Sequence, residues 1–221
     1  MKKVIYNKFD KRLFSTFSVE RFPGRIVVIQ TTEEAEEAVD FLLSQSILGV
    51  DTETKPSFKK GVASHLVALL QVSTHDICFL FRLNKIGITP AIKRFLEDRQ
   101  VKKVGLSWHD DLLSLKKREM FTPGFFVDLQ DVISDIGVED KSLQKLYANI
   151  FHKKINKRQQ LTNWEKSELD DKQKMYAALD AWACIQLYEE IMRLKESGDY
   201  ELIVLEEPQE ETTPDNNSEH V

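Results

Sequence analysis

The sequence predicts a mixed α/β fold organised around one central sheet. Two observations predict it. First, short apolar segments bounded by polar turns follow one another through the first half of the chain, with one amphipathic helix among them. Second, the pattern turns helical from about residue 129 onward. The length of 221 residues fits one domain and is sufficient to bury a core.

Six segments read as strands, because they are short and rich in Val, Ile, Leu and Phe. They comprise residues 25–30, 47–53, 67–73, 76–81, 103–106 and 125–128. The third and fourth are close enough in the chain to form a hairpin. A helix follows the first strand, because Thr31 as its N-cap and Glu34 three residues later form a capping box.

The second half of the chain is predicted to be helical. Amphipathic stretches span residues 129–136 and 142–151, and a polar connector follows them. A long final helix begins near Asp170, which forms a second capping arrangement with Gln173, and its apolar period continues to about residue 194.

The formal net charge of −5 hides an uneven distribution. Residues 206–221 contain six acidic residues and no Lys or Arg, so the rest of the chain carries a net charge of +1. Because this segment has no apolar period, we expect a disordered acidic tail. An N-terminal extension over residues 1–24 and a folded domain over residues 25–200 precede it. A near-neutral body with local basic clusters can still form a positive patch.

The chain is expected to work in the cytoplasm. No apolar run approaches the roughly 20 residues that span a bilayer. The basic N-terminus is not followed by the apolar segment of a secretory signal. Cys78 and Cys184 lie in apolar stretches far apart in sequence, which favours buried free thiols over a disulfide or a zinc site.

Two acidic residues end the second strand. Asp51 and Glu53 are two positions apart, so on a strand they point to the same face as paired carboxylates. Like charges at that spacing are costly unless a cation lies between them. A strand that runs into a solvated turn would give the same pattern, so this motif alone does not establish a site.

A third acid interrupts the apolar final helix. Asp180 lies among Ala, Leu, Trp and Cys residues, and a carboxylate is seldom buried unless it is paired or binds a metal. Tyr176 lies four residues earlier, so its hydroxyl shares a helix face with Asp180. The alternative is an acid that faces solvent or pairs with Lys or Arg.

Adjacent acids lie where the fifth strand runs into a helix. Asp110 and Asp111 could simply cap that helix, and His109 could be a loop or cap residue. Acids at the ends of separate elements can also converge on one point. Four carboxylates around two hard cations suit in-line phosphodiester hydrolysis, because one ion makes hydroxide from water and the other stabilises the leaving oxygen.

Taken in order, these motifs resemble those of the tyrosine-bearing branch of the DEDD exonuclease superfamily. They are Asp51-x-Glu53, then Gly105 with Asp111 and Leu115, then Tyr176-x-x-x-Asp180. Met175 occupies the position where the sister branch has histidine, so the chain is similar to ribonuclease D and to the exonuclease domain of the Werner-syndrome helicase. Asp111 is preferred to Asp110 because only Asp111 gives the family's spacing. The resemblance covers about residues 25–195.

The resemblance implies a ribonuclease-H-like fold, with a mixed central sheet of about five strands flanked by helices. It implies a 3′–5′ exonuclease that releases nucleoside 5′-monophosphates and uses two divalent cations, Mg²⁺ or Mn²⁺. Asp51, Glu53 and Asp180 would hold the ion that activates water. Asp51 and Asp111 would hold the second ion, and Tyr176 would orient the attacking water. The alternative is a catalytically silent nucleic-acid-binding module on the same fold.

The expected partner is a single-stranded 3′ end of DNA or RNA, and the sequence identifies no membrane or protein partner. The expected contacts are Thr52, Lys55, Phe58, Trp108 and Lys157. Lys would supply sequence-independent affinity for phosphates, and aromatic side chains could stack on terminal bases. Trp108 is equally well placed to be core. Further basic residues flank the motifs and their connector, namely Lys59, Lys60, Lys102, Lys103, Lys153, Lys154 and Arg158.

Overall fold

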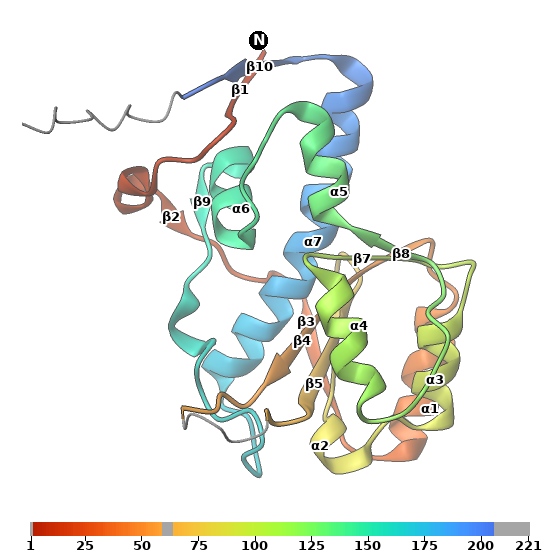
Figure 1. Ribbon diagram of the computed structural model, residues 1–221. Helices are drawn as coiled ribbons and strands as arrows, with labels where there is room; N and C mark the ends of the chain where they lie inside the picture. Colours follow the sequence, from red (N-terminus) through yellow and green to blue (C-terminus); the bar gives the residue numbers. More distant parts are fainter. Residues whose placement is uncertain (1, 59–63, 206–221) are drawn as a thin grey trace, which may run out of the picture.

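Six strands form a mixed sheet in this computed structural model, which describes residues 2–58 and 64–205 (Figure 1). Their order across the sheet is β3-β6-β5-β4-β7-β8. Their bounds are Arg25–Ile29 for β3, Ile77–Phe81 for β6, Val67–Ser73 for β5, Ile47–Thr54 for β4, Lys102–Gly105 for β7 and Phe126–Asp128 for β8. Each of the six coincides with a segment that the sequence predicts as a strand, although β4 ends one residue later and β7 begins one residue earlier than predicted. The sheet has one strand more than the five or so that the resemblance implies.

One strand runs against the others. β5 is antiparallel to both of its neighbours, β4 and β6, whereas the β3–β6, β4–β7 and β7–β8 pairs are parallel. The predicted hairpin of β5 and β6 is therefore present. In the β4–β5 register, Asp51 lies opposite Gln71, and this pairing fixes which side chains leave the sheet on each face.

Helices cover both faces of the sheet (Figure 1). Those in the described residues are α1 (Thr32–Leu42), α2 (Leu83–Ile86), α3 (Pro90–Glu97), α4 (Trp108–Lys116), α5 (Leu129–Ile133), α6 (Leu143–Phe151) and α7 (Asp171–Ser197). Short 3₁₀ turns are η1 (Lys11–Thr16), η2 (Ser134–Ile136) and η3 (Lys157–Gln159). Two of these helices, α2 and α3, were not predicted from the sequence.

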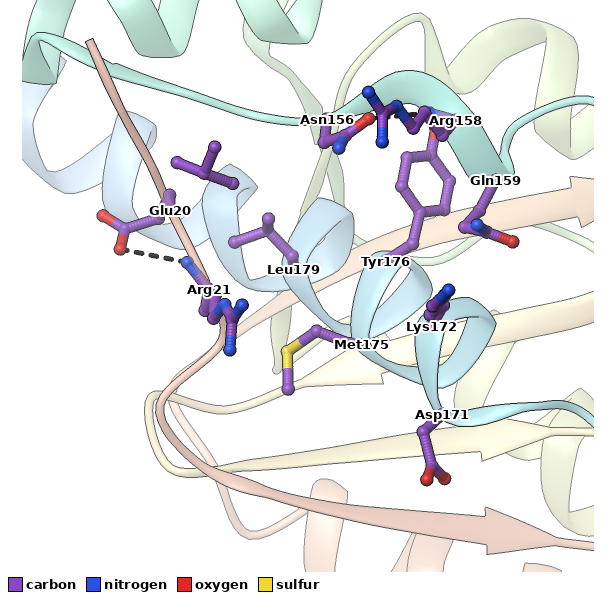
Figure 2. A pocket seen from close by; sticks show the side chains of 11 residues that line it. Glu20, Arg21, Asn156, Arg158, Gln159, Asp171, Lys172, Met175, Tyr176 and Leu179 are labelled. Atoms are coloured by element: carbon purple, nitrogen blue, oxygen red, sulfur yellow. Dashed lines mark hydrogen bonds between the residues drawn. The ribbon is translucent and has the colours of Figure 1, made fainter.

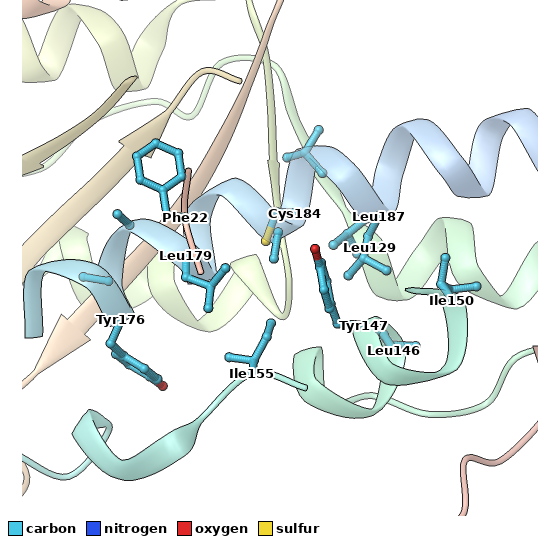
Figure 3. Packing of buried hydrophobic residues seen from close by; sticks show 14 of the residues in the cluster. Phe22, Leu129, Leu146, Tyr147, Ile150, Ile155, Tyr176, Leu179, Cys184 and Leu187 are labelled. Atoms are coloured by element: carbon cyan, nitrogen blue, oxygen red, sulfur yellow. The ribbon is translucent and has the colours of Figure 1, made fainter. Parts of the chain in front are cut away.

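The long helix α7 lies across one face of the sheet and forms the centre of the larger core cluster. Figure 3 shows Leu187 of α7 beside Leu129 and Tyr147, and Leu179 of the same helix beside Ile155. On the opposite face, α1 and α3 build a second cluster. The site-bearing helix α7 is therefore anchored by buried apolar contacts, which stabilise roughly in proportion to the area removed from water.

The N-terminal segment is joined to the folded body. β1 (Lys3–Tyr6) pairs in parallel with β10 (Tyr200–Ile203), and β2 (Ser18–Val19) pairs in parallel with β9 (Lys153–Lys154). Residues that the sequence analysis treats as an extension therefore cover the region next to α6 and the connector before α7. The predicted acidic tail, residues 206–221, lies outside the described residues.

Local sequence signals are confirmed at the helix starts. Thr31 and Glu34 form both bonds of a capping box before α1, and Asp170 and Gln173 do the same before α7. Both cysteines are free and buried, as expected. Among the described helices, none combines the length and the apolar character needed to cross a membrane.

Candidate active site

Three carboxylates converge where β4 faces α7. Oxygens of Asp51, Glu53 and Asp180 all lie within 4.8 Å of one another. Asp51 and Glu53 share a face of β4, as their spacing predicts, and Asp180 reaches them from α7. Hard divalent cations prefer such groups of carboxylate oxygens.

A glycine permits this convergence. Gly49 lies two residues before Asp51 on β4, and a Cβ at this position would lie 1.9 Å from the carbonyl oxygen of Ala181. α7 therefore rests directly on the backbone of β4, a contact that a larger residue would prevent. Because Ala181 follows Asp180, the same contact sets the height of the Asp180 carboxylate above Asp51.

The three acids lie close enough for their negative charges to repel one another. Burial, and then the charges of Asp51 and Asp180, raise the pKa of Glu53 to about 10. Burial, and then the charge of Asp180, raise the pKa of Asp51 well above its ordinary value. Burial also raises the pKa of Asp180 to about 7.

The donor set fits a divalent cation. One oxygen of Asp180, Oδ1, is buried and has no hydrogen-bond partner within the described part of the chain. An unpartnered buried carboxylate oxygen is costly. A cation among the three carboxylates would satisfy that oxygen and would offset the repulsion that raises the pKa values.

Asp111 lies at the edge of this cluster. The Thr52 hydroxyl donates a hydrogen bond to its carboxylate, and its charge raises the pKa of both Asp51 and Glu53. Burial raises the pKa of Asp111 itself to about 6. The neighbouring Asp110 is exposed. Of the two adjacent acids, Asp111 is therefore the one that faces the other carboxylates.

A strained turn precedes α4, the helix that carries Asp111. Ser107 adopts a left-handed conformation with φ of 56° between β7 and α4. The Asp128 carboxylate holds this turn, because it accepts hydrogen bonds from the backbone amides of Ser107 at 3.0 Å and Trp108 at 2.7 Å. Asp128 thus satisfies amides at the start of α4 that lack a partner within the helix.

Tyr176 lies one turn before Asp180 on α7. Only 8% of the residue is exposed, and its ring tilts against Trp164 with centroids 6.2 Å apart. Its hydroxyl lowers the pKa of Asp180 by hydrogen bonding. Burial, and then the charge of Asp180, raise the pKa of Tyr176, so the phenol stays protonated and can donate a hydrogen bond.

A pocket of about 360 Å³ opens over these side chains. It combines the three clustered acids and Tyr176 with two lysines that form no salt bridge among the described residues, and with apolar walls. Its lining residues are Asp51, Thr52, Glu53, Leu106, Lys141, Ser142, Leu143, Gln144, Ile155, Lys157, Gln160, Tyr176, Asp180 and Cys184. The site can therefore receive a ligand that carries both negative charge and an apolar part.

Two of the residues expected to contact nucleic acid are accessible. Phe58 is 79% exposed beyond the end of β4, and Lys157 lines the pocket. Lys55 is already paired with Glu165, with the charged atoms 3.2 Å apart. Thr52 lines the pocket, but its hydroxyl is engaged with Asp111.

Burial argues against one expected contact, Trp108, and against one of the flanking basic residues, Lys103. Trp108 is only 2% exposed, and it stacks on Phe126 with centroids 5.3 Å apart in the core cluster on the far face of the sheet. Lys103 is fully buried and donates to the backbone carbonyls of Asp98 and Val101. Both side chains are therefore packed inside the protein and do not form part of its surface. Residues 59 and 60, two more of the expected basic residues, lie outside the described residues.

One polar residue beside the acids was not predicted from the sequence. Gln71 lies directly opposite Asp51 in the β4–β5 pairing, so both side chains leave the sheet on the same face. Gln71 is fully buried, and within the described residues neither its Oε1 nor its Nε2 has a hydrogen-bond partner. The available signal was one Gln in the otherwise apolar core of a strand.

Comparison with known proteins matches residues 26–195 to the model of the 3′-5′ exonuclease family. The chain is 28% identical over 186 residues to the bifunctional 3′-5′ exonuclease/ATP-dependent helicase WRN of Mus musculus, which covers 80% of this chain and 13% of that protein. It is 29% identical over 204 residues to a 3′-5′ exonuclease of Arabidopsis thaliana, with 82% of this chain and 68% of that protein covered. The chain thus spans only a small part of the mouse protein.

Solved structures share the fold. The Nibbler EXO domain of Aedes aegypti superposes with a TM-score of 0.70 at 22% identity, over 80% of this chain and 91% of that one. RNase D of Trypanosoma brucei, solved as a complex with RNA, superposes with a TM-score of 0.66 at 20% identity, over 77% of this chain and 63% of that one. The architecture is therefore the ribonuclease-H-like fold that the resemblance implies.

Proposed function

The chain belongs to the DEDD-type family of 3′–5′ exonucleases, which are hydrolases, and we propose that it removes nucleotides stepwise from the 3′ end of a single-stranded nucleic acid. The products would be nucleoside 5′-monophosphates. The observation that carries this proposal is the cluster of Asp51, Glu53 and Asp180, whose oxygens lie within 4.8 Å of one another. One of these oxygens is buried and has no hydrogen-bond partner among the described residues.

Divalent metal use is implied by the family, and we propose Mg²⁺ or Mn²⁺ at two positions. Asp51, Glu53 and Asp180 would hold one ion, and Asp51 and Asp111 the other. When bound, such ions supply an acidified water and stabilise the charge that develops on phosphate oxygens. The raised pKa values of the carboxylates support this assignment, because a cation among them would favour their charged forms.

The surrounding side chains would position the substrate. Tyr176 lines the pocket, and its protonated hydroxyl would hold the attacking water in line with the phosphorus. Lys157 and Lys141 line the same pocket and would attract the phosphate. The exposed ring of Phe58 would stack against the terminal base.

The proposed substrate is a single strand of either DNA or RNA. The T. brucei RNase D structure contains RNA, which supports RNA for this chain, whereas the mouse relative is described only as an exonuclease and helicase. A comparison of the two strand types decides between them.

The test is a cleavage assay on 5′-end-labelled single strands of DNA and RNA, with Mn²⁺ or Mg²⁺ and with chelator. A ladder that shortens from the 3′ end, seen only with metal, supports the proposal. A circular single strand is the control, because it has no 3′ end and should remain intact. Cleavage in chelator would contradict the metal assignment. Binding without cleavage in metal would instead identify a silent nucleic-acid-binding module.

A further inference from the structure

A second pocket shares Tyr176 with the candidate active site. It has a volume of about 470 Å³ and lies between the N-terminal segment at residues 19–21 and the connector at residues 156–159, with α7 between them (Figure 2). Its lining residues are Val19, Glu20, Arg21, Asn156, Arg158, Gln159, Asp171, Lys172, Met175, Tyr176 and Leu179. Pockets of this size accommodate small organic ligands or parts of larger ones.

Both acids in this lining are already neutralised by cations outside it. The Glu20 carboxylate pairs with Lys153 at 2.7 Å, and it also accepts a hydrogen bond from the Tyr147 hydroxyl. The Asp171 carboxylate pairs with Lys174, again at 2.7 Å. Each acid therefore already has a cationic partner that lies outside the lining.

Three cations in the lining have no such partner. Arg21, Arg158 and Lys172 are exposed, and their side chains make no salt bridge or hydrogen bond within the part of the chain that the structure describes. Each comes from a different part of the chain: Arg21 from the N-terminal segment, Arg158 from η3 and Lys172 from the first turn of α7. Three positive charges thus converge on one hollow from separate parts of the fold. Such a convergence favours an anionic ligand.

The connector links the two pockets. We call the pocket lined by Asp51, Glu53 and Asp180 the acidic pocket, and the one lined by Arg21, Arg158 and Lys172 the cationic pocket. Residues 155–160 contribute alternately to both, because Ile155, Lys157 and Gln160 line the acidic pocket while Asn156, Arg158 and Gln159 line the cationic one. Tyr176 borders both hollows. An anion that leaves the acidic pocket past Tyr176 or over η3 would therefore meet the three unpaired cations.

We propose that the cationic pocket binds the phosphate backbone of a single strand upstream of the nucleotide that is being removed. This inference rests on the proposed exonuclease function and names a binding site for its substrate. Arg21, Arg158 and Lys172 contact phosphates, while the Met175 and Leu179 side chains offer an apolar surface to a sugar or base. The N-terminal segment thus becomes part of the substrate-binding surface.

The test is strand binding in chelator, so that cleavage does not interfere. Fluorescence anisotropy would compare a single strand of about twelve nucleotides with a dinucleotide, since single-strand sites usually span several nucleotides. The test protein carries Arg21→Gln, Arg158→Gln and Lys172→Gln. The matched control carries Arg25→Gln, Arg99→Gln and Lys117→Gln. These residues are also exposed, make no salt bridge within residues 2–58 and 64–205, and lie outside both pockets. Melting temperatures check that both proteins fold, and Arg21→Gln alone provides a milder variant.

The test protein should bind the longer strand at least about tenfold more weakly than wild type at low salt, and the control should not. The slope of log affinity against log salt should fall by about 2, because each phosphate contact on a single strand contributes about 0.7. The gain in affinity from dinucleotide to longer strand should shrink in the test protein alone. Equal losses in test and control proteins, or no loss in either, would overturn the inference.

A cleavage arm separates this inference from the function on which it rests. If the wild-type protein cuts strands with metal but the test protein behaves like the control, only the cationic pocket is rejected. If the wild-type protein neither binds nor cuts the strands, the proposed function is rejected as well.

Discussion

Asp180 is a charged residue in a helix whose buried residues are otherwise almost all apolar. Without metal, its charge opposes those of Asp51 and Glu53, so it serves the proposed reaction and does not stabilise the apo fold. Gln71 does not stabilise the fold either, because its amide is buried and lacks a hydrogen-bond partner among the described residues. At the residue scale, the site therefore concentrates groups that the fold alone does not favour.

Asp180→Asn should abolish turnover but leave the apo protein as stable as wild type, or more stable by up to about 1 kcal/mol, because it removes one repelling charge. Chemical denaturation in chelator measures the stability, and Asp110→Asn, which alters an exposed acid next to the site, is the matched control. A loss of more than about 2 kcal/mol would mark Asp180 as a structural residue instead.

Tyr176→Phe removes a hydroxyl that we place next to the attacking water. Turnover should fall by at least about tenfold, while the fold and strand affinity are kept, because positioning and proton-transfer effects contribute about 10² to 10⁴ in rate. Tyr188→Phe is the control, since Tyr188 lies on the same helix and accepts a hydrogen bond from Lys102 at 2.8 Å. Unchanged turnover in the Tyr176 variant would remove this residue from the mechanism.

At the scale of elements, the contact of α7 with β4 sets the geometry of the site. Gly49→Ala places a methyl group 1.9 Å from the Ala181 carbonyl oxygen, so the helix must move away from the strand. We expect a stability loss of about 1–3 kcal/mol together with a larger loss of turnover, because Asp180 moves with the helix. Thermal unfolding and steady-state kinetics measure the two effects. A variant with full turnover would show that the close contact is not required.

A second element contact joins the N-terminal strand to α7. Arg193 donates to Glu190 at 2.8 Å, and Lys3 of β1 also donates to it. Arg193 and Lys3 hold the pKa of Glu190 at about 2, below its usual 4.5. A carboxyl whose pKa is lowered on folding adds stability above pH 4.5 and loses it as the pH falls towards 2.

Glu190→Gln should therefore destabilise the protein by about 1 kcal/mol at pH 7, and the difference from wild type should vanish near pH 2. Denaturation curves across this pH range measure the effect. Glu189→Gln on the same helix, whose carboxylate contacts the ring of His75 instead, is the control. A difference that persists unchanged at low pH would show that the Glu190 contacts do not act through charge.

At the scale of the whole molecule, the sequence predicted what depends on neighbours along the chain. The capping boxes at Thr31 and Asp170 involve residues three positions apart, and the strands have an apolar pattern of their own. Tertiary contacts were not predictable in this way. The burial of Trp108 depends on its contact with Phe126, and the pairing of β1 with β10 joins segments about 200 residues apart.

The same limit applies to the site. Asp51, Glu53 and Asp180 could be nominated, because an acid in an apolar segment is visible in the sequence. Arg21 could not be placed beside Tyr176, because the pairing of β2 with β9 brings the N-terminal segment to the connector. Gln71 was overlooked because its significance comes from the strand that lies opposite it.

The central claim is that the cluster of Asp51, Glu53 and Asp180 binds the divalent cation on which strand hydrolysis depends. Calorimetric titration with Mn²⁺, run beside cleavage assays at the same ion concentrations, tests it most directly. Wild-type protein should bind the ion, cleavage should rise with occupancy, and Asp51→Asn should lose both. Cleavage that proceeds without bound Mn²⁺, or unchanged ion binding in Asp51→Asn, would contradict the account.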